Sequence, residues 1–223
     1  MALDWALWPR LTYAGGLELQ ERLRARRARG SDDLAAVLEH DPVVTLGPRA
    51  DGDDLLVPVG ELERRGITVA RSERGGLATY HGPGQLVVYP IVALKREAIR
   101  SYVGLLEDAA LAVVTACGVA GTRRNGHPGV WVGESKVASI GIRVRGGIAC
   151  HGLAINLTVD CTPFSWIRPC GLSAGAVTSI AALGGRPVPS ADAARIAVER
   201  LAAGLGAAAR ESSWQDLEGG EAA

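Results

Sequence analysis

Two residues with reactive side chains, a lysine and a cysteine, lie in the stretch from Gly129 to Ser179. Lys136 is one of only two lysines in the chain, and the other 22 of the 24 basic residues are arginine. Arginine stays protonated in proteins, whereas a lysine removed from water can lose its proton and act as a base. Lys136 is therefore a candidate proton acceptor.

Cys170 is placed between Pro169 and Gly171, in a segment that reads as a loop. Proline fixes the approach of the chain, and glycine leaves the sulfur open on its other side. A free thiol has a pKa of about 8.5, so it needs a base to become a good nucleophile. A neutral amine at Lys136 could take that proton and then stabilise the thiolate. This interpretation requires the fold to close the 34-residue gap between the two.

A predicted β-hairpin positions Lys136. Residues 136–145 read as a strand, Gly146 and Gly147 as its turn, and residues 148–159 as a second apolar run. Side chains alternate along a strand, so Lys136 shares a face with apolar residues unless a bulge intervenes. We expect it to point toward apolar surroundings, although a lysine at a strand end can also extend to water.

Further helices and strands are expected on both sides of the hairpin. The expected helices are 16–29, 59–65, 99–117, 177–183 and 190–209, and the expected strands are 42–47, 67–71, 85–93 and the run that begins at Gly129. Pro90 favours an edge position or a strand end for 85–93. Residues 211–223 read as a polar, frayed tail. The arginine-rich face of 16–29 is expected to be solvated, with docking of an acidic partner as the alternative.

The composition excludes several classes of protein. A length of 223 residues suggests one domain, spanning 1–223, and the 24 acidic and 24 basic residues leave no net charge to attract nucleic acid or an anionic membrane. The first residues lack the pattern of a secretory signal, and no apolar run approaches the roughly 20 residues that span a bilayer. We therefore expect a cytoplasmic protein without a membrane partner.

Other cysteines and histidines offer alternative chemistry. Cys117 and Cys150 are expected to be small buried apolar side chains, and Cys161 is left open. His40, His81 and His151 compete with Lys136 for the role of base, since a cysteine–histidine pair is common. A metal site is not expected, because Cys150 and His151 are adjacent on a strand and point to opposite faces. No phosphate-binding GxxxxGK[ST] loop occurs.

Five ordered blocks of sequence resemble the octanoyltransferases of lipoate biosynthesis. The blocks are RGGxxTYHGPGQ at 74–85, GVWV at 129–132 with Lys136, IGI at 140–142, HGLAxN at 151–156, and PCG at 169–171 with VTS at 177–179. By these blocks the chain is identified as a member of this family over about residues 40–183.

The resemblance implies a fold and a mechanism. The expected fold is α+β (mixed α/β), like the catalytic domain of biotin and lipoate ligases, with a mixed sheet flanked by helices. Cys170 would accept an octanoyl group as a thioester, and Lys136 would activate the thiol. Because transfer from thioester to thioester to amide runs downhill, no cofactor or ATP is expected.

The resemblance also implies binding residues and partners. The acyl-binding segments would be Arg74, Gly75, Gly76, Leu77, Ala78, Thr79, Tyr80 and His81; Ser139, Ile140 and Gly141; and Gly152, Leu153 and Ala154. The expected donor is octanoyl-acyl carrier protein. The expected acceptors are lipoyl domains of 2-oxoacid dehydrogenase subunits and the glycine cleavage H protein. The alternatives are an ATP-dependent lipoate or biotin protein ligase, a non-enzymatic acyl-binding domain and a thiol hydrolase.

Overall fold

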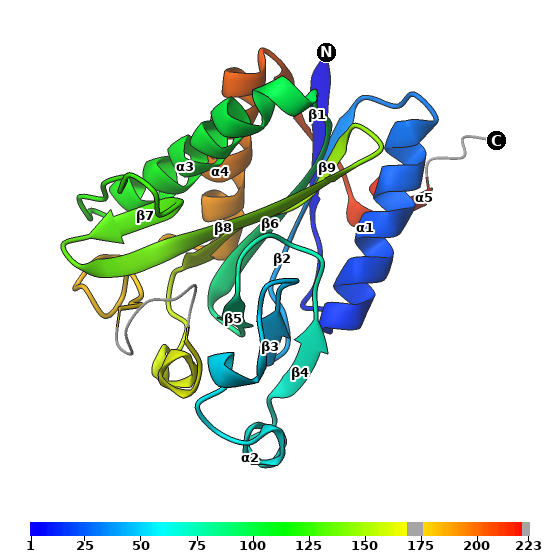
Figure 1. Cartoon of the computed structure of the whole chain (residues 1–223). Coiled ribbons are helices and arrows are strands. Elements are labelled where there is room, and N and C mark those ends of the chain that lie inside the picture. The colour runs from blue at the N-terminus through cyan, green and yellow to red at the C-terminus, as the bar shows by residue number, and fades with distance from the viewer. Residues whose placement is uncertain (169–175, 220–223) are drawn as a thin grey trace.

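Two β-sheets with helices around them form the part of the chain that the structure describes, residues 1–168 and 176–219 (Figure 1). In this computed structural model the strands are β1 (Ala2–Leu7), β2 (Asp33–Leu38), β3 (Val43–Leu46), β4 (Thr68–Arg71), β5 (Ala78–His81), β6 (Gln85–Ala93), β7 (Gly129–Val132), β8 (Ser135–Arg145), β9 (Ile148–Asn156) and β10 (Ala208–Glu211). The α-helices are α1 (Tyr13–Ala28), α2 (Val59–Arg64), α3 (Ile99–Ala116), α4 (Ser190–Leu205) and α5 (Trp214–Gly219). Short 3-10 turns are η1 (Gly52–Asp54), η2 (Arg96–Ala98) and η3 (Thr162–Trp166).

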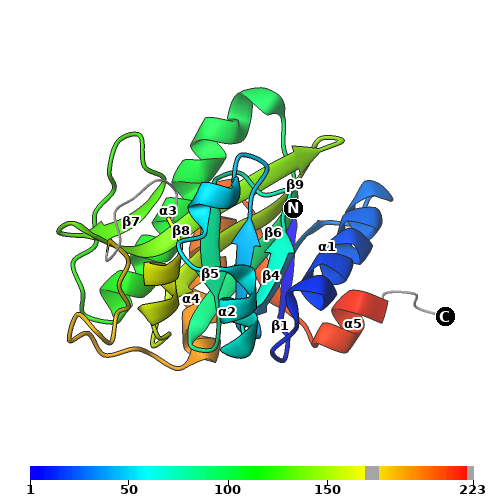
Figure 2. The ribbon, with the colours of Figure 1, turned by 60° about the horizontal axis from the view of Figure 1, so that its bottom comes forward.

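The larger sheet has seven strands in the order β10-β1-β2-β6-β9-β8-β7. β1 pairs in parallel with β10 and β2, and the pairs from β2 onward are antiparallel. Helices α3 and α4 cover one face, and α1 and α5 lie on the other (Figures 1 and 2). An apolar core fills the space on each face. The mixed sheet flanked by helices that the resemblance implies is therefore confirmed.

A three-stranded sheet, in the order β4-β3-β5, packs beside the larger one. Its core includes Val44, Ala78 and Tyr80, with the Tyr80 ring edge-on to Phe164 of η3 at 5.6 Å between centroids. Successive side chains on β5 point to opposite sides. Thr79 and His81 therefore face away from this core, toward the larger sheet.

The hairpin expected around Lys136 is confirmed. β8 and β9 are joined by Gly146 and Gly147, whose φ angles of 58° and 74° suit the two positions of a type I′ turn. A bulge interrupts the pairing of β7 with β8 at Trp131, which lies opposite Lys136. Lys136 is nevertheless only 5% exposed, so the lysine is buried and does not extend to water.

Pro90 lies inside β6, which is paired on both sides with β2 and β9. The expectation of an edge or strand end is therefore wrong. The β6–β9 pairing is interrupted between Val88 and Val92, where His151 has a φ of 58°. Gly152 packs so closely on the proline that a Cβ would come within 2.6 Å of its Cδ. Pro90, which has no N–H, thus lies where the regular pairing between β6 and β9 is already interrupted.

Two of the expected helices also need correction. The helix expected over 177–183 is absent: Val177 forms a parallel bridge with Lys136, and a turn follows at 180–184. The helix expected over 190–209 ends at Leu205, because Gly206 adopts a left-handed conformation with φ of 68°. The chain then enters β10. The expected helices at 16–29, 59–65 and 99–117 are confirmed, with ends shifted by up to three residues.

The described part of the expected tail, residues 211–219, is ordered. Glu211 belongs to β10, and α5 buries Leu217 against the face that α1 covers. Arginines of α1 hold this helix: Arg22 pairs with Glu218, and Arg26 donates to the carbonyl of Leu217. The arginine-rich face is therefore largely engaged within the chain. In residues 1–168 and 176–219, no helix has both the length and the apolar character to cross a bilayer.

Candidate active site

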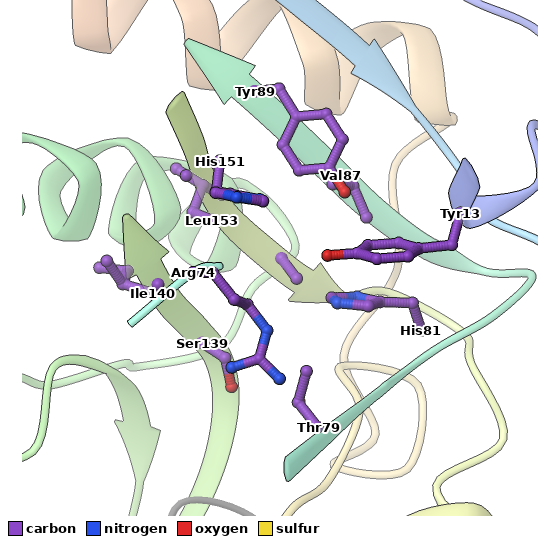
Figure 3. A pocket seen from close by; sticks show the side chains of 13 residues that line it. Tyr13, Arg74, Thr79, His81, Val87, Tyr89, Ser139, Ile140, His151 and Leu153 are labelled. Carbon is purple, nitrogen blue, oxygen red and sulfur yellow. The ribbon is translucent and has the colours of Figure 1, made fainter. Parts of the chain in front are cut away.

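A mainly apolar cavity, here called the inner cavity, opens between the two sheets (Figure 3). Its lining consists of Tyr13, Arg74, Thr79, His81, Val87, Tyr89, Ser139, Ile140, Gly141, His151, Gly152, Leu153 and Ala154. Strands β5, β6, β8 and β9 supply most of these residues. The three segments expected to bind an acyl group, which are far apart in the sequence, thus converge on one cavity.

A second hollow, here called the outer groove, contains Lys136. It is lined by Arg49, Gly75, Gly76, Val103, Gly126, His127, Pro128, Lys136, Ile140, Gly141 and Ile142. It shares Ile140 and Gly141 with the inner cavity. The lysine therefore lies in a hollow that adjoins the apolar inner cavity at these two residues.

Glycines permit the close packing at this junction. The N–H of Gly75 donates to the carbonyl of Ile142 on β8 at 3.0 Å. A Cβ on Gly141 would lie 2.9 Å from the carbonyl oxygen of Gly75. The segment 74–76 can therefore lie directly against β8, where Arg74 lines the inner cavity and Gly75 and Gly76 line the outer groove.

The backbone and side chain of Lys136 are both held in place. Its N–H donates to the carbonyl of Ala176 at 2.7 Å, and its carbonyl accepts from the N–H of Thr178 at 3.0 Å. Its Nζ lies 5.5 Å from the centroid of the Trp131 ring, within the range of a cation–π contact. A Cβ on Gly129 would come within 2.5 Å of the lysine Cε, so glycine at 129 leaves room for the side chain.

Arg74 places a buried guanidinium on the wall of the inner cavity. The side chain donates to the hydroxyl and carbonyl of Thr45 and to the carbonyls of Gly75 and Leu77, at 2.7–3.2 Å. Figure 3 shows it beside Ser139. These bonds fix loop 74–77 to β3, and the positive charge acts on the histidines across the cavity.

The cavity histidines are neutral at pH 7. Burial, followed in importance by the nearby His40 and Arg74, lowers the pKa of His81 to about 3. Burial likewise lowers the pKa of His151 to about 4, with help from Arg74 and Arg143. Imidazoles with such low pKa values are weak bases, and this favours Lys136 over either histidine as the proton acceptor.

Aromatic side chains that the sequence did not reveal as site residues close the inner end of the cavity. The Tyr13 ring stacks on His81 at 6.3 Å between centroids, as Figure 3 shows, and its hydroxyl donates to Ser72. The Tyr89 hydroxyl bonds to Nε2 of His40 at 2.7 Å. Because the other ring nitrogen of His40 faces a carbonyl oxygen and must donate, this hydroxyl is the donor. No local pattern links α1 to β6, so only the fold brings these residues together.

His151 does not follow the strand pattern. Alternation predicts that it shares a side with Leu153 and Ile155. With its φ of 58°, its ring instead meets Tyr89, which belongs to the core on the opposite face of the sheet, at 6.2 Å. The irregularity in β9 thus places an imidazole on the cavity wall.

Some expected site residues lie elsewhere. Ala78 and Tyr80 are buried in the core of the small sheet, and Leu77 contributes a carbonyl to Arg74 without lining either hollow. Cys170 lies outside the described residues.

The described cysteines, Cys117, Cys150 and Cys161, line neither the inner cavity nor the outer groove. Cys117 is buried in the core beneath α3. Burial raises the pKa of the Cys150 and Cys161 thiols to about 11. Neither of these two thiols is therefore an activated nucleophile. In the described ranges, no three His, Cys, Asp or Glu side chains gather as metal ligands would.

Two solved structures with this arrangement of sheets and helices are lipoate protein ligases. Lipoate-protein ligase A bound with ATP matches with a TM-score of 0.82 at 17% identity, covering 99% of this chain and 92% of that chain. The bi-partite lipoate protein ligase from Thermoplasma acidophilum, described together with its E2 lipoyl domain, matches with a TM-score of 0.78 at 17% identity, covering 99% and 90%. These likenesses define the fold class.

The sequence defines the family. The chain belongs to the lipoyl protein ligase A/B catalytic domain family, whose model matches residues 12–202. A relative from Desulfovibrio desulfuricans, named octanoyltransferase, is 40% identical over 190 residues, which cover 84% of this chain and 80% of the relative. The kinship expected from the five sequence blocks is confirmed.

Proposed function

We propose that this protein is an octanoyltransferase that moves an octanoyl group from acyl carrier protein to a lysine of a lipoyl domain. The relative named octanoyltransferase supports the reaction class. The archaeal ligase described with its E2 lipoyl domain supports an acceptor of that kind. The carrier-protein donor and the H protein as a further acceptor are implied by the family resemblance, and a cytoplasmic location by the composition; all three stay predictions.

The observation that carries the proposal is a nearly buried lysine next to an apolar cavity. Lys136 is 5% exposed in a groove that joins the inner cavity at Ile140 and Gly141. An octanoyl chain in that cavity would gain roughly 5 kcal/mol, at about 0.8 kcal/mol for each buried CH₂. Its carbonyl end would then lie toward the lysine.

Chain connectivity supports Cys170 as the nucleophile. Ala176 is hydrogen-bonded to the backbone of Lys136, and Cys170 precedes it by six residues in the sequence. Six residues reach at most about 20 Å when extended. The length of chain therefore allows the thiol to approach the amine.

Two acyl transfers follow in the proposed mechanism. The neutral amine of Lys136 takes the proton of Cys170, and the thiolate attacks the carbonyl carbon of the donor thioester. The carrier thiol leaves with that proton, and the octanoyl group stays on Cys170. The neutral amine of the acceptor lysine then attacks this thioester, and Lys136 takes the proton that the nitrogen loses as the amide forms. The cysteine leaves as a thiolate and recovers this proton from Lys136.

Intact-mass measurement after mixing the protein with octanoyl-carrier protein tests the proposal. We expect a gain of one octanoyl group that hydroxylamine removes, and no such adduct in Cys170→Ser. Addition of a lipoyl domain should then discharge the adduct onto the domain. Release of free octanoate in place of a modified domain would indicate a hydrolase, and retention without transfer would indicate a binding protein.

The ATP-dependent ligase is the second candidate, because a ligase bound with ATP shares the fold. A ligase would modify the lipoyl domain when given free octanoate and ATP, and it would not need Cys170. We expect no modification under those conditions. Modification of the domain by free octanoate and ATP with Cys170→Ser would overturn the proposal.

A further inference from the structure

Two buried amide side chains, Gln85 and Asn156, connect the wall of the inner cavity with the backbone around Lys136. They are direct partners at the start of β6 and the end of β9. Gln85 is 2% and Asn156 3% exposed, and neither lines the inner cavity or the outer groove. Any contribution that they make to the reaction must therefore pass through other residues.

The hydrogen bonds of Gln85 reach the cavity wall. Its Nε2 donates to the carbonyl of Tyr80 at 3.2 Å and to Oδ1 of Asn156 at 2.8 Å. These two donor bonds fix the orientation of the amide, so its Oε1 is the atom 2.6 Å from Nδ1 of His81. The His81 imidazole must then carry its proton on Nδ1.

Asn156 is bonded on its other side to the segment next to Lys136. Its side-chain Nδ2 donates to the backbone carbonyl of Thr178 at 2.8 Å, and the backbone carbonyl of Asn156 accepts from the N–H of Ile180 at 2.8 Å. The N–H of Thr178 in turn donates to the carbonyl of Lys136, and the N–H of Lys136 donates to Ala176. Residues 176–178 are therefore held between Asn156 of β9 and Lys136 of β8.

We propose that Gln85 and Asn156 are positioning residues for acyl transfer: they fix segment 176–178, and with it the backbone of Lys136, relative to the wall of the inner cavity. The inference rests on the proposed function, because it assigns a role within that reaction. The donors all point the same way, from His81 through both amides to Thr178, and aligned bonds of this kind strengthen one another. Burial excludes water as a substitute partner.

Asn156→Ala and Asn156→Asp test the pair. The first removes the amide, and the second keeps its shape and the acceptor for Gln85 but loses the donor to Thr178. We expect kcat for octanoyl transfer to fall roughly 10- to 100-fold in both, the loss typical of a small misplacement of reacting groups. KM for the octanoyl donor should stay within about twofold, since the cavity is unchanged.

A matched control separates positioning from general loss of stability. Val198→Ala removes two methyl groups from a fully buried side chain of α4. This side chain lies in the core between the larger sheet and helices α3 and α4. We expect it to lower the melting temperature while kcat stays within about twofold of the wild type at a temperature where the variant is folded.

The tautomer of His81 gives a readout independent of turnover. In the wild type, nitrogen NMR of the labelled imidazole should show the proton on Nδ1. Gln85→Leu removes the acceptor, so the resonances should move toward a mixture of tautomers, and kcat should fall with KM unchanged. An unchanged His81 spectrum in Gln85→Leu would contradict the assignment.

The outcomes distinguish the two proposals. If the wild type takes no octanoyl group from the carrier protein, the proposed function fails and the positioning role fails with it. If the wild type transfers normally but the Asn156 variants lose no more activity than Val198→Ala, or lose it through KM, only the positioning role is refuted. A fall in kcat alone, in Asn156 and Gln85 variants but not in the control, supports it.

Discussion

The inner cavity and the outer groove meet at Ile140 and Gly141, yet they differ in nearly every physical respect. Four polar side chains of the inner cavity, those of Arg74, Thr79, His81 and His151, are buried, and both histidines are neutral at pH 7. The outer groove includes the exposed residues Arg49 and His127, and only its inner end, at Lys136, is buried.

In the proposed function, this difference separates acyl binding from proton transfer along strand β8. β8 presents Ser139 to the inner cavity and Lys136 to the outer groove, and Gly141 allows the two hollows to meet. The mainly apolar wall suits an uncharged hydrocarbon chain, because its guanidinium, that of Arg74, is already hydrogen-bonded to the carbonyls of Thr45 and Leu77. The proposed function requires the amine of Lys136 to lie near a thioester, and its burial next to the junction of the two hollows agrees with that role.

The largest effect on octanoyl transfer is expected from a substitution in the outer groove, at Lys136. Lys136→Arg keeps the charge but cannot accept a proton, so we expect octanoyl transfer to fall roughly 100- to 10,000-fold. The rate of octanoyl transfer from carrier protein to lipoyl domain measures it. Lys95→Arg, at the exposed second lysine, is the matched control and should transfer normally. Normal transfer by Lys136→Arg would refute the general-base role.

An intermediate effect is expected from the cavity. Ala154→Leu adds three carbons to the wall opposite Val87 and should displace about two methylenes of the acyl chain. At about 0.8 kcal/mol per CH₂, kcat/KM for octanoyl relative to hexanoyl donor should fall roughly 15-fold. Ala154→Ser, which keeps the size of the side chain, is the control. An unchanged chain-length preference in Ala154→Leu would mean that the acyl chain binds elsewhere.

The smallest effect concerns stability in acid. The pKa of His81 is about 3 when folded and about 6.5 when unfolded, so the unfolded chain binds more protons between these values. The stability that depends on neutral His81 is complete above pH 6.5 and is lost progressively as the pH falls toward 3. At pH 5.5 the free energy of unfolding should be roughly 1 kcal/mol lower than at pH 8 from this group.

Urea unfolding at both pH values measures this difference, and His81→Gln should reduce it. Tyr13→Phe changes the same wall without removing the imidazole, so it should keep the pH dependence of the wild type. If His81→Gln and the wild type lose stability equally between pH 8 and 5.5, the imidazole is not held neutral by burial.

Local sequence patterns were sufficient to predict β6, the hairpin that contains Lys136, and α3. Strand β6 was predicted with the bounds that the structure gives, α3 to within one residue, and the Gly146-Gly147 hairpin with its turn in place and its second strand three residues too long. Each has a strong periodic pattern and clear turn residues, which act over a few positions. The substrate segments were found through motif resemblance, and nine of those residues line the inner cavity.

Strands that depend on distant partners were missed. β2 contains Ala35 and Ala36, which have weak strand propensity but are fully buried between helices and neighbouring strands. β1 pairs with β10 from the far end of the chain. Residues 177–183 resemble a helix in isolation, yet Lys136 supplies a pairing partner that draws Val177 into a bridge. In each case tertiary pairing overrides local preference.

The sequence by itself determined which residue types are available for chemistry: a rare lysine on a predicted hairpin strand, a cysteine between proline and glycine, and glycines where the backbone must approach closely. Only the tertiary structure decided that Lys136 is buried where the two hollows meet and that Tyr13 and Tyr89 close the inner cavity. It also decided that Gln85 and Asn156 connect the wall of this cavity with the backbone around Lys136. The physical reason is that motifs record local requirements of the chain, whereas burial and hydrogen-bond partners depend on segments that meet only after folding.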